Sequence, residues 1–260
     1  MVIDDVEITK IIFNRFSKNF NKAFEADVAI AGAGPSGLVA AKYLAKAGKD
    51  VVLFERKLSI GGGMWGGGMS FPVIVVQKES KHLLNEAGIG TNDESGGYYS
   101  ADAIESVTKL CGSAIDAGAK LFNNITVEDV LFTKEKSVGG FVINWSTIDI
   151  AGLHVDPLTI RAKFCIDATG HPAEICKIVQ RKCKPEKGPL RSSNTEIIEK
   201  SMCAEIGEKA VVDNTKEVYP GLYVTGMCAN AVYGSQRMGP IFGGMLLSGK
   251  KVADLILKKH

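Results

Sequence analysis

Three side chains in the second half of the sequence could together bind a metal ion. His154 and Asp156 lie two residues apart in the stretch 151–157, so in an extended segment their side chains point to the same side. His171 directly follows residues 167–170 (DATG), where a predicted strand ends, and ligand sites gather at strand ends in open α/β sheets. Two histidines and one carboxylate are typical of a non-haem iron site. The alternative is that both histidines are ordinary loop residues with hydrogen-bond partners.

A glycine motif near the N-terminus predicts a dinucleotide site. Gly32, Gly34 and Gly37 follow a short apolar strand and precede a helical stretch. In this motif the first glycine permits a tight turn, the second lets a pyrophosphate approach the backbone, and the third lets helix and strand pack closely. Glu55 ends the next predicted strand, near the usual distance of about 20 residues for a carboxylate that binds ribose hydroxyls. The alternative is a doubly wound fold that has lost its ligand.

Weaker signals bear on which dinucleotide binds. Residues 167–170 and the pair Thr225-Gly226 are similar to segments of FAD-dependent enzymes of the glutathione-reductase type. Those enzymes often carry an acidic residue after the late glycine, and Met227 stands there in this chain. This difference argues against a flavin. Arg56, beside Glu55, is suited to adenosine or phosphate groups.

The elements that must position these residues alternate between strands and helices. Residues 27–31 and 51–54 are predicted as short buried strands, and the helical stretch between them completes a βαβ unit that begins at residue 26. The pattern predicts an α/β fold over a single domain, residues 1–260, with a Rossmann-type dinucleotide-binding unit, a parallel central sheet and a small additional β region. Further elements are expected as helices at 7–23, 100–117 and 245–257, strands at 158–168 and 221–225, and strands within 121–150 with a turn near 139–140.

Other segments have an open role. Residues 59–70 contain six glycines, which predicts a loop whose backbone closely approaches another group. In that loop Met64 and Trp65 could either cover a nucleotide or anchor the loop. The apolar positions of the helix at 7–23 suit packing on the body or on a partner. Residues 181–195 are polar and contain Pro185, Gly188 and Pro189, which predicts a surface loop.

Composition excludes several classes of protein. The net charge is +2 and the basic residues are spread along the chain, which gives no case for nucleic-acid binding. No apolar run is close to the length of about 20 residues that spans a membrane. The first residues lack the basic start and the apolar stretch of a secretory signal. Cysteines without a CxxC pair in such a chain indicate reduced thiols and a cytoplasmic protein. His82 and His260 are expected at the surface. The cysteines are Cys111, Cys165, Cys176, Cys183, Cys203 and Cys228.

Several motifs taken together closely resemble the thiamine thiazole synthase family. They are GAGPSG at 32–37, the pair Glu55-Arg56, GGGMWGGGM at 61–69, HVDP at 154–157, ATGH at 168–171, RMGP at 237–240 and FGGMLLSG at 242–249. The resemblance covers roughly residues 10–257. Its middle and late motifs are far more specific than the glycine fingerprint, because RMGP before a glycine-rich helix start is not a general dinucleotide signature.

The resemblance implies a glutathione-reductase-like fold and a particular reaction. In this family NAD is a substrate and not a hydride carrier. Nicotinamide is released, the ADP-ribose part isomerises to a ketose, and glycine condenses with it to give an imine. Sulfur is then added, and cyclisation gives an adenylated thiazole carboxylate. The family is a transferase-type enzyme of thiamine biosynthesis that uses iron(II).

The matching motifs also imply roles for individual residues. Asp156 and His171 are expected to bind iron(II), with the two ligands coming from different protomers. Arg237 is expected to bind the glycine carboxylate, which suits a guanidinium fork. The expected contacts to the ADP-ribose part are Ser36, Glu55, Arg56, Gly63, Val127 and Met227, in addition to Gly32, Gly34 and Gly37 of the fingerprint.

One departure from the eukaryotic members concerns the sulfur source. Those members carry a sacrificial cysteine where this chain has His154, and no cysteine lies in the matching loop. The archaeal branch, which takes sulfur from free sulfide, resembles this chain in having histidine there. The resemblance therefore implies a multiple-turnover, sulfide-dependent enzyme in which His154 is an acid, base or binding group near the metal. It also implies a homo-octamer.

Two other classes of function stay open on the residues alone. One is an enzyme of the same fold with different chemistry, either an FAD-dependent oxidoreductase or an isomerase that acts on a ribose bisphosphate. The other is a non-catalytic NAD-binding module. The fold cannot decide between these classes, because one fold hosts many functions.

Overall fold

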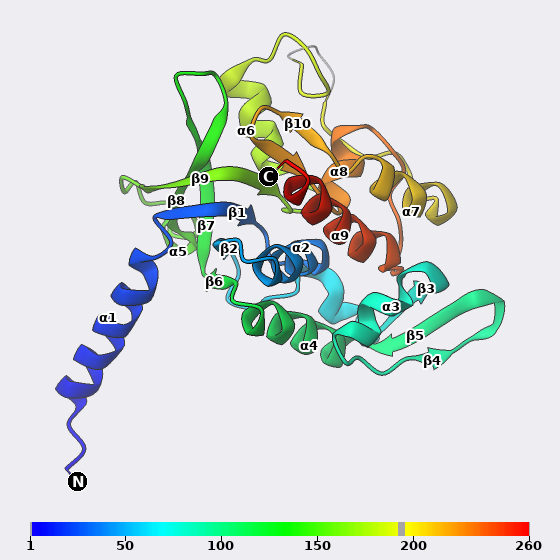
Figure 1. Cartoon of the computed structure of the whole chain (residues 1–260), viewed down its shortest axis with the longest axis horizontal. Helices are drawn as coiled ribbons and strands as arrows, with labels where there is room; N and C mark the ends of the chain where they lie inside the picture. The colour runs from blue at the N-terminus through cyan, green and yellow to red at the C-terminus, as the bar shows by residue number, and fades with distance from the viewer. Residues whose placement is uncertain (1, 192–195, 260) are drawn as a thin grey trace.

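The computed structural model describes residues 2–191 and 196–259. It has an α/β architecture with a mostly parallel central sheet and a separate small antiparallel sheet (Figure 1), as the sequence predicts. The central sheet has the order β10-β11-β9-β1-β2-β6, and the β7–β8 hairpin joins it along β9. Its strands are β1 (Glu25–Ala31), β2 (Val51–Glu55), β6 (Lys120–Asn123), β7 (Ile125–Phe132), β8 (Val138–Trp145), β9 (Leu158–Asp167), β10 (Glu217–Tyr219) and β11 (Leu222–Val224).

The remaining elements cover this sheet or extend from it. The small antiparallel sheet pairs β3 (Val73–Gln77), β5 (Tyr98–Asp102) and β4 (Asn92–Asp93). The helices are α1 (Asp5–Asn21), α2 (Pro35–Lys46), α3 (Lys78–Glu86), α4 (Ala103–Asp116), α5 (Ser146–Ile150), α6 (Glu174–Cys183), α7 (Ala204–Asp213), α8 (Met227–Val232) and α9 (Gly243–Leu257). Over the described residues, no helix combines the length and the apolar character that crossing a bilayer requires.

The core lies on both faces of the sheet because the strands are buried on both sides. Along β1, Val28 and Ile30 pack in one cluster with α2, α4 and α9, whereas Ala29 and Ala31 pack in a second cluster with β7, β8, α6 and α8. Alternate side chains of a strand point to opposite faces, so an apolar run such as DVAIA is what a two-sided burial requires. The two clusters fix β1 in the middle of the molecule.

The turn of the β7–β8 hairpin lies elsewhere than the sequence predicts. The strands are connected by residues 133–137, and the glycines at 139–140 lie inside β8. Gly140 has φ +155°, and a Cβ there would lie 2.0 Å from the carbonyl oxygen of Ile160 on β9. Gly140 therefore permits a close approach between β8 and β9, which a sequence cannot distinguish from a turn.

Helix α1 projects away from the body of the molecule (Figure 1), and aromatic side chains near its C-terminal end pack against the body. It runs two residues earlier at each end than the predicted 7–23. The Phe16 and Phe20 rings stack with centroids 5.2 Å apart, and the Phe20 ring lies 5.2 Å from that of Phe122. The first turns leave Ile8, Ile11, Ile12 and Phe13 exposed. Packing of this face on a partner stays a prediction.

Two predictions fall partly outside the described residues. The expected loop at 181–195 begins later, because α6 continues to Cys183. Residues 192–195 of that loop, and His260, lie outside the residues that the structure describes. His82 is exposed on α3, as predicted.

Candidate active site

A cavity of about 480 Å³ opens where β1, β2 and β9 end. Parallel strands bring their carboxyl ends to one edge of the sheet, which is where open α/β folds bind ligands. The cavity is also lined from β7, from the start of α8 and from the segment that precedes α9. The predicted site residues that line it are Gly32, Gly34, Ser36, Glu55, Arg56, Gly63, Val127, His171, Met227 and Arg237.

The glycine fingerprint forms the floor of this cavity through close backbone contacts. Gly32 has φ +103°, which favours glycine. Gly37 does not line the cavity and instead packs beneath it, where a Cβ would lie 2.1 Å from the carbonyl oxygen of Gly32. Around Gly34 a Cβ would meet nothing within 4 Å. The second glycine thus keeps space open on the ligand side, and the third permits the strand–helix contact.

Glu55 is fixed by two backbone amides at the end of β2. The carboxylate is buried; it accepts from the amide of Ala33 at 3.0 Å and from the amide of Lys57 at 2.9 Å. Because one of these amides belongs to the glycine turn, the carboxylate and the turn form one unit. This position matches that of the acidic residue that binds ribose hydroxyls in dinucleotide folds.

The glycine-rich loop closes on the fingerprint. The amide of Gly61 donates to the carbonyl of Ala33 at 2.8 Å. Met64 is buried in the core, and the Trp65 indole N–H donates to the carbonyl of Ile60. Neither side chain is among the described lining residues of the cavity. Of the two roles that the sequence left open for Met64 and Trp65, the structure therefore supports anchoring.

Arg56 forms an ion pair that the sequence did not predict. Its guanidinium pairs with the carboxylate of Glu174, the first residue of α6, and both residues line the cavity. Burial raises the pKa of the Glu174 carboxyl, and Arg56 opposes this rise. Because α6 lies far from Arg56 in the sequence, no local pattern pointed to Glu174.

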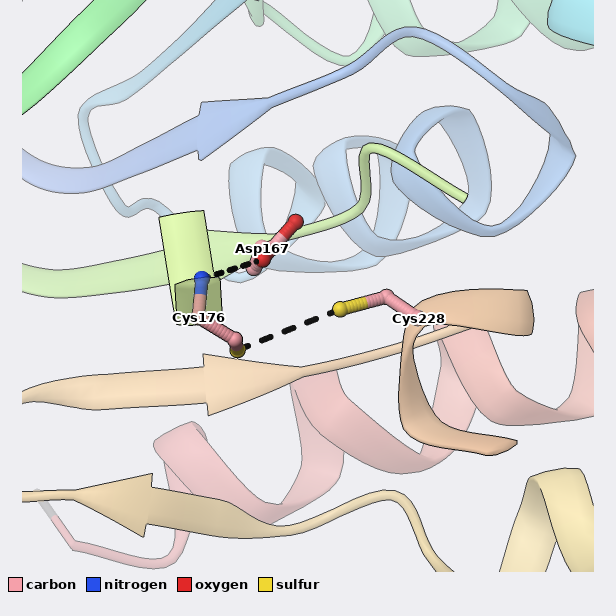
Figure 2. Close-up of side chains that lie close together, drawn as sticks. All are labelled: Asp167, Cys176 and Cys228. Carbon is pink, nitrogen blue, oxygen red and sulfur yellow. Dashed lines mark hydrogen bonds between the residues drawn. The ribbon is translucent and has the colours of Figure 1, made fainter. Parts of the chain in front are cut away.

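Asp167 shapes the turn that carries His171 into the cavity. Its buried carboxylate accepts from the Thr169 amide at 3.0 Å and from the Thr169 hydroxyl at 2.7 Å. It also accepts from the Cys176 amide at 2.9 Å, a bond that Figure 2 shows. The Thr169 hydroxyl in turn accepts from the amide of Glu174 at 2.9 Å. Asp167 therefore ties the end of β9 to the first turn of α6, and His171 lies between these two fixed points.

Asp167, Cys176 and Cys228 form a buried cluster (Figure 2), which we interpret as structural. The two sulfur atoms are 4.0 Å apart. Burial raises the pKa of Cys176 to about 12 and that of Cys228 well above its usual range, so both thiols stay protonated. A cysteine that binds a metal must be a thiolate, whereas both of these thiols are protonated. The cluster thus supports α6 and α8 beneath the cavity.

We expect Asp167→Ala to lower the thermal stability of the protein markedly. The substitution leaves the buried amide of Cys176 and the two partly buried donors of Thr169 without their acceptor, which costs roughly 2–4 kcal/mol in all. Thermal unfolding at a fixed protein concentration would measure the loss. Asp116→Ala, at the exposed end of α4, is the matched control and should change the midpoint little. Equal midpoints for the two variants would contradict the role assigned to Asp167.

His171 is held from a second side by Glu199. Its Nδ1 lies 2.8 Å and 2.9 Å from the two carboxylate oxygens of Glu199. The other ring nitrogen, Nε2, is not part of this pair. A histidine that donates one ring N–H to a carboxylate and keeps the other nitrogen free is a common arrangement of metal ligands. The donor chemistry at His171 therefore fits an iron(II) site.

The structure does not bring His154 and Asp156 to His171 within one chain. Both lie in the exposed loop between α5 and β9, and neither is among the described lining residues of the cavity. In this loop the carbonyl of Val155 accepts from the side-chain amide of Asn144 at 3.0 Å, and the amide of Leu153 donates to the carbonyl of Ile148 at 3.0 Å. The sequence suggested that His154 and Asp156 lie near His171. In the structure, β9 separates the loop that carries His154 and Asp156 from the turn that carries His171. Asp156 does not line the cavity that His171 lines in the same chain, so the ligand set that joins the two residues stays a prediction.

Arg237 approaches the cavity on an extended segment that pairs with residues 200–203. The amide of Arg237 donates to the carbonyl of Lys200 at 3.1 Å, and the amide of Cys203 donates to the carbonyl of Arg237 at 2.9 Å. Arg237 is exposed and lines the cavity together with Met238, Gly239 and Pro240. The RMGP motif therefore lies at the same opening as His171.

Comparison with known proteins identifies the family. A model described as the Thi4 family matches residues 9–242. The thiamine thiazole synthase of Methanothermobacter thermautotrophicus is 53% identical over 260 residues, covering 100% of this chain and 99% of the relative. That of Pyrococcus furiosus is 52% identical over 258 residues, covering 99% of each. The crystal structure of Thermovibrio ammonificans THI4 superimposes with a TM-score of 0.95 at 48% identity, covering 100% of this chain and 99% of the other. The chain therefore belongs to the Thi4 family, as its motifs predict.

Proposed function

We propose that this chain is a sulfide-dependent thiazole synthase of thiamine biosynthesis. It would convert NAD, glycine and sulfide into an adenylated thiazole carboxylate, release nicotinamide and use iron(II). The observation that carries the proposal is that the dinucleotide fingerprint, His171 and Arg237 all open into one cavity in a chain of this family. A binding module for NAD alone would need neither His171 nor Arg237 there.

In this proposal the ADP-ribose part of NAD lies along the glycine fingerprint. The amides at the start of α2 and the positive end of the helix dipole suit the pyrophosphate, and that helix has no side-chain cap that would compete. Glu55 is suited to the ribose hydroxyls. Gly63, Val127 and Met227 would complete the contacts, with Arg56 at the adenosine end beside Glu174.

The ribose end of NAD that reacts with glycine would lie between Arg237 and His171. Arg237 would hold the glycine carboxylate through its two-pronged guanidinium. His171 would bind iron(II) together with Asp156 of a second copy, and His154 would arrive on the same loop as an acid, base or binding group. Iron(II), when bound, supplies open coordination positions and polarises the reacting groups.

The position of the cysteines supports sulfide as the sulfur source. Cys165, Cys176 and Cys228 are buried in the core, and none of the six cysteines is among the described lining residues of the cavity. A protein thiol that gives up its sulfur would have to reach the reacting atoms. We therefore propose that sulfur comes from free sulfide and that the enzyme turns over many times.

The proposal includes the assembly and the compartment. A homo-octamer would pair the exposed loop of one copy with the cavity of another and would cover the apolar face of α1. We propose a cytoplasmic location, which agrees with six cysteines that are all free.

The proposal is tested by anaerobic incubation of the iron(II)-loaded protein with NAD and glycine, with and without sulfide. Mass spectrometry should detect an adenylated thiazole only with sulfide, in excess of one equivalent per chain. Intact NAD under all conditions would overturn the proposal. A product limited to one equivalent, formed without sulfide, would contradict the sulfur source only.

We expect the wild-type protein to prefer NAD over NADP, and Glu55→Ala to weaken NAD binding about 10- to 100-fold. The reason is the loss of about 1.5–3 kcal/mol from hydrogen bonds between ribose hydroxyls and a charged carboxylate. The 2′-phosphate of NADP would also be repelled by the negative charge of Glu55. Calorimetric titration of both nucleotides would measure this. Equal affinity of the wild-type protein for NAD and NADP would contradict the role given to Glu55.

A further inference from the structure

Glu199 is in direct contact with His171, and nothing in the family motifs points to it. Both carboxylate oxygens lie within 2.9 Å of the histidine Nδ1. The Glu199 side chain is only 11% exposed, whereas that of His171 is 47% exposed. The carboxylate is therefore much less exposed to solvent than the ring that it contacts.

This contact selects one form of the imidazole ring. A neutral imidazole carries a single N–H, and a carboxylate accepts hydrogen bonds but cannot donate them when ionised. In a neutral ring that makes this contact with an ionised carboxylate, the proton is on Nδ1 and the Nε2 lone pair is unprotonated. A hydrogen bond to an ionised carboxylate is about twice as strong as one between neutral groups, so it favours the neutral form that carries its proton on Nδ1. An unprotonated Nε2 is what a metal ligand requires.

The backbone at Glu199 is tied to the Arg237 segment. Next to Glu199, the amide of Lys200 donates to the carbonyl of Ser235 at 2.9 Å, and the amide of Arg237 donates to the carbonyl of Lys200 at 3.1 Å. Residues 200–203 thus run alongside 235–237. A shift of either segment would move both the carboxylate beside His171 and the arginine at the cavity.

We propose that Glu199 is a positioning residue that holds His171 as the Nδ1–H form, aims Nε2 into the cavity and links this ligand to Arg237. The inference rests on the proposed function, because it assumes that His171 binds the metal. In this proposal Glu199 acts through His171 and does not itself bind the metal. Metal ligands in other proteins show this support commonly, and its loss lowers metal affinity about 10- to 100-fold.

The first experiment needs no metal and no activity. Full-length protein with ¹⁵N-labelled histidine is sedimented, and magic-angle-spinning NMR distinguishes protonated from unprotonated ring nitrogens at about pH 8.5, where an unperturbed histidine is neutral. A difference spectrum against His171→Ala isolates the His171 signals. We expect Nδ1–H in the wild-type protein and in Glu199→Gln, whose amide oxygen can still accept. In Glu199→Ala we expect a mixture of both forms. An unchanged His171 signal in Glu199→Ala overturns the proposal.

The second experiment measures metal affinity with cobalt(II) as the probe, because its absorption spectrum reports the ligand set. Glu199→Ala should bind cobalt(II) about 10- to 100-fold more weakly than the wild-type protein, and Glu199→Gln should recover most of this loss. Glu205→Ala, an exposed carboxylate on α7, is the matched control and should bind like the wild-type protein. Affinity for NAD, measured in parallel, should be the same in all of these variants.

The outcomes separate this inference from the proposed function. If His171→Ala binds cobalt(II) as tightly as the wild-type protein, His171 is not a ligand and the proposed metal site is wrong. If His171→Ala loses binding while Glu199→Ala keeps it, the metal site stands and the role of Glu199 is wrong. A cobalt(II) spectrum in Glu199→Ala that indicates one ligand fewer, with His171 still bound, would make Glu199 a direct ligand and also overturn the positioning role.

Discussion

Gly37→Ala is expected to destabilise the protein by about 3 kcal/mol or more, at the upper end of what overpacking a core costs. The added Cβ would lie 2.1 Å from the carbonyl oxygen of Gly32 and 3.3 Å from the Cβ of Ala168. The first of these is a backbone atom in a turn that Glu55 and the glycine-rich loop also hold, so it cannot move aside without disturbing both. The midpoint of thermal unfolding should fall by on the order of 10 °C.

Two further glycine variants make this prediction specific. Gly34→Ala adds a Cβ that meets nothing within 4 Å, so we expect normal stability but weak NAD binding, since the methyl group points toward the ligand side of the turn. Gly112→Ala, in the interior of α4, also meets nothing within 4 Å and should stabilise the protein by up to about 1 kcal/mol. A Gly37→Ala protein as stable as the Gly34→Ala protein would contradict the packing argument.

Two inactive variants are expected to restore activity when they are assembled together. Asp156→Ala and His171→Ala should each lose nearly all thiazole formation, because each removes one proposed iron ligand. Within one chain the two residues lie apart, with only His171 at the cavity. If one copy supplies Asp156 to the cavity of another, a randomly mixed oligomer contains intact sites. About one quarter of the sites should then carry both ligands.

The measurement uses both variants co-expressed with different affinity tags and purified over both. Activity near one quarter of the wild-type value supports a site shared between copies. If instead one chain supplied both ligands, every site in the mixture would carry a lesion and activity would stay near zero. Co-expression of two differently tagged Asp156→Ala chains is the control. A protein that is monomeric in solution would also contradict the shared site.

Local rules were sufficient for much of the fold. The strand at 27–31, its following glycine turn and the helix up to Lys46 were predictable because each depends on neighbouring residues: an apolar run, glycines at fixed spacing and a helix-forming stretch. Glu55 was predictable for the same reason, since a βαβ unit sets the distance between its two strand ends. The motifs of the family also predicted Met227 and Arg237 as site residues. Both lie far from the glycine fingerprint in the sequence, and both line the same cavity.

The sequence was least informative where a residue serves a contact distant in sequence. The glycines at 139–140 suggested a turn, and this prediction was wrong, because Gly140 is needed where β9 passes too close for a side chain. His154 and Asp156 suggested a site with His171, and this site stays a prediction, because within one chain both residues lie on an exposed loop and do not line the cavity. In each case the residue type was informative and its partner was not identifiable.

The sequence by itself determined the α/β class, the dinucleotide turn and the family, because these follow from local periodicity and from motifs of fixed spacing. Only the tertiary structure decided which carboxylate supports each functional side chain: Glu174 beside Arg56, and Glu199 beside His171. It also decided that Asp167 holds the turn of His171 through hydrogen bonds within the core. Such pairs depend on how strands and helices far apart in the chain pack against one another, and a hydrogen bond between distant residues leaves no pattern in the sequence of either partner.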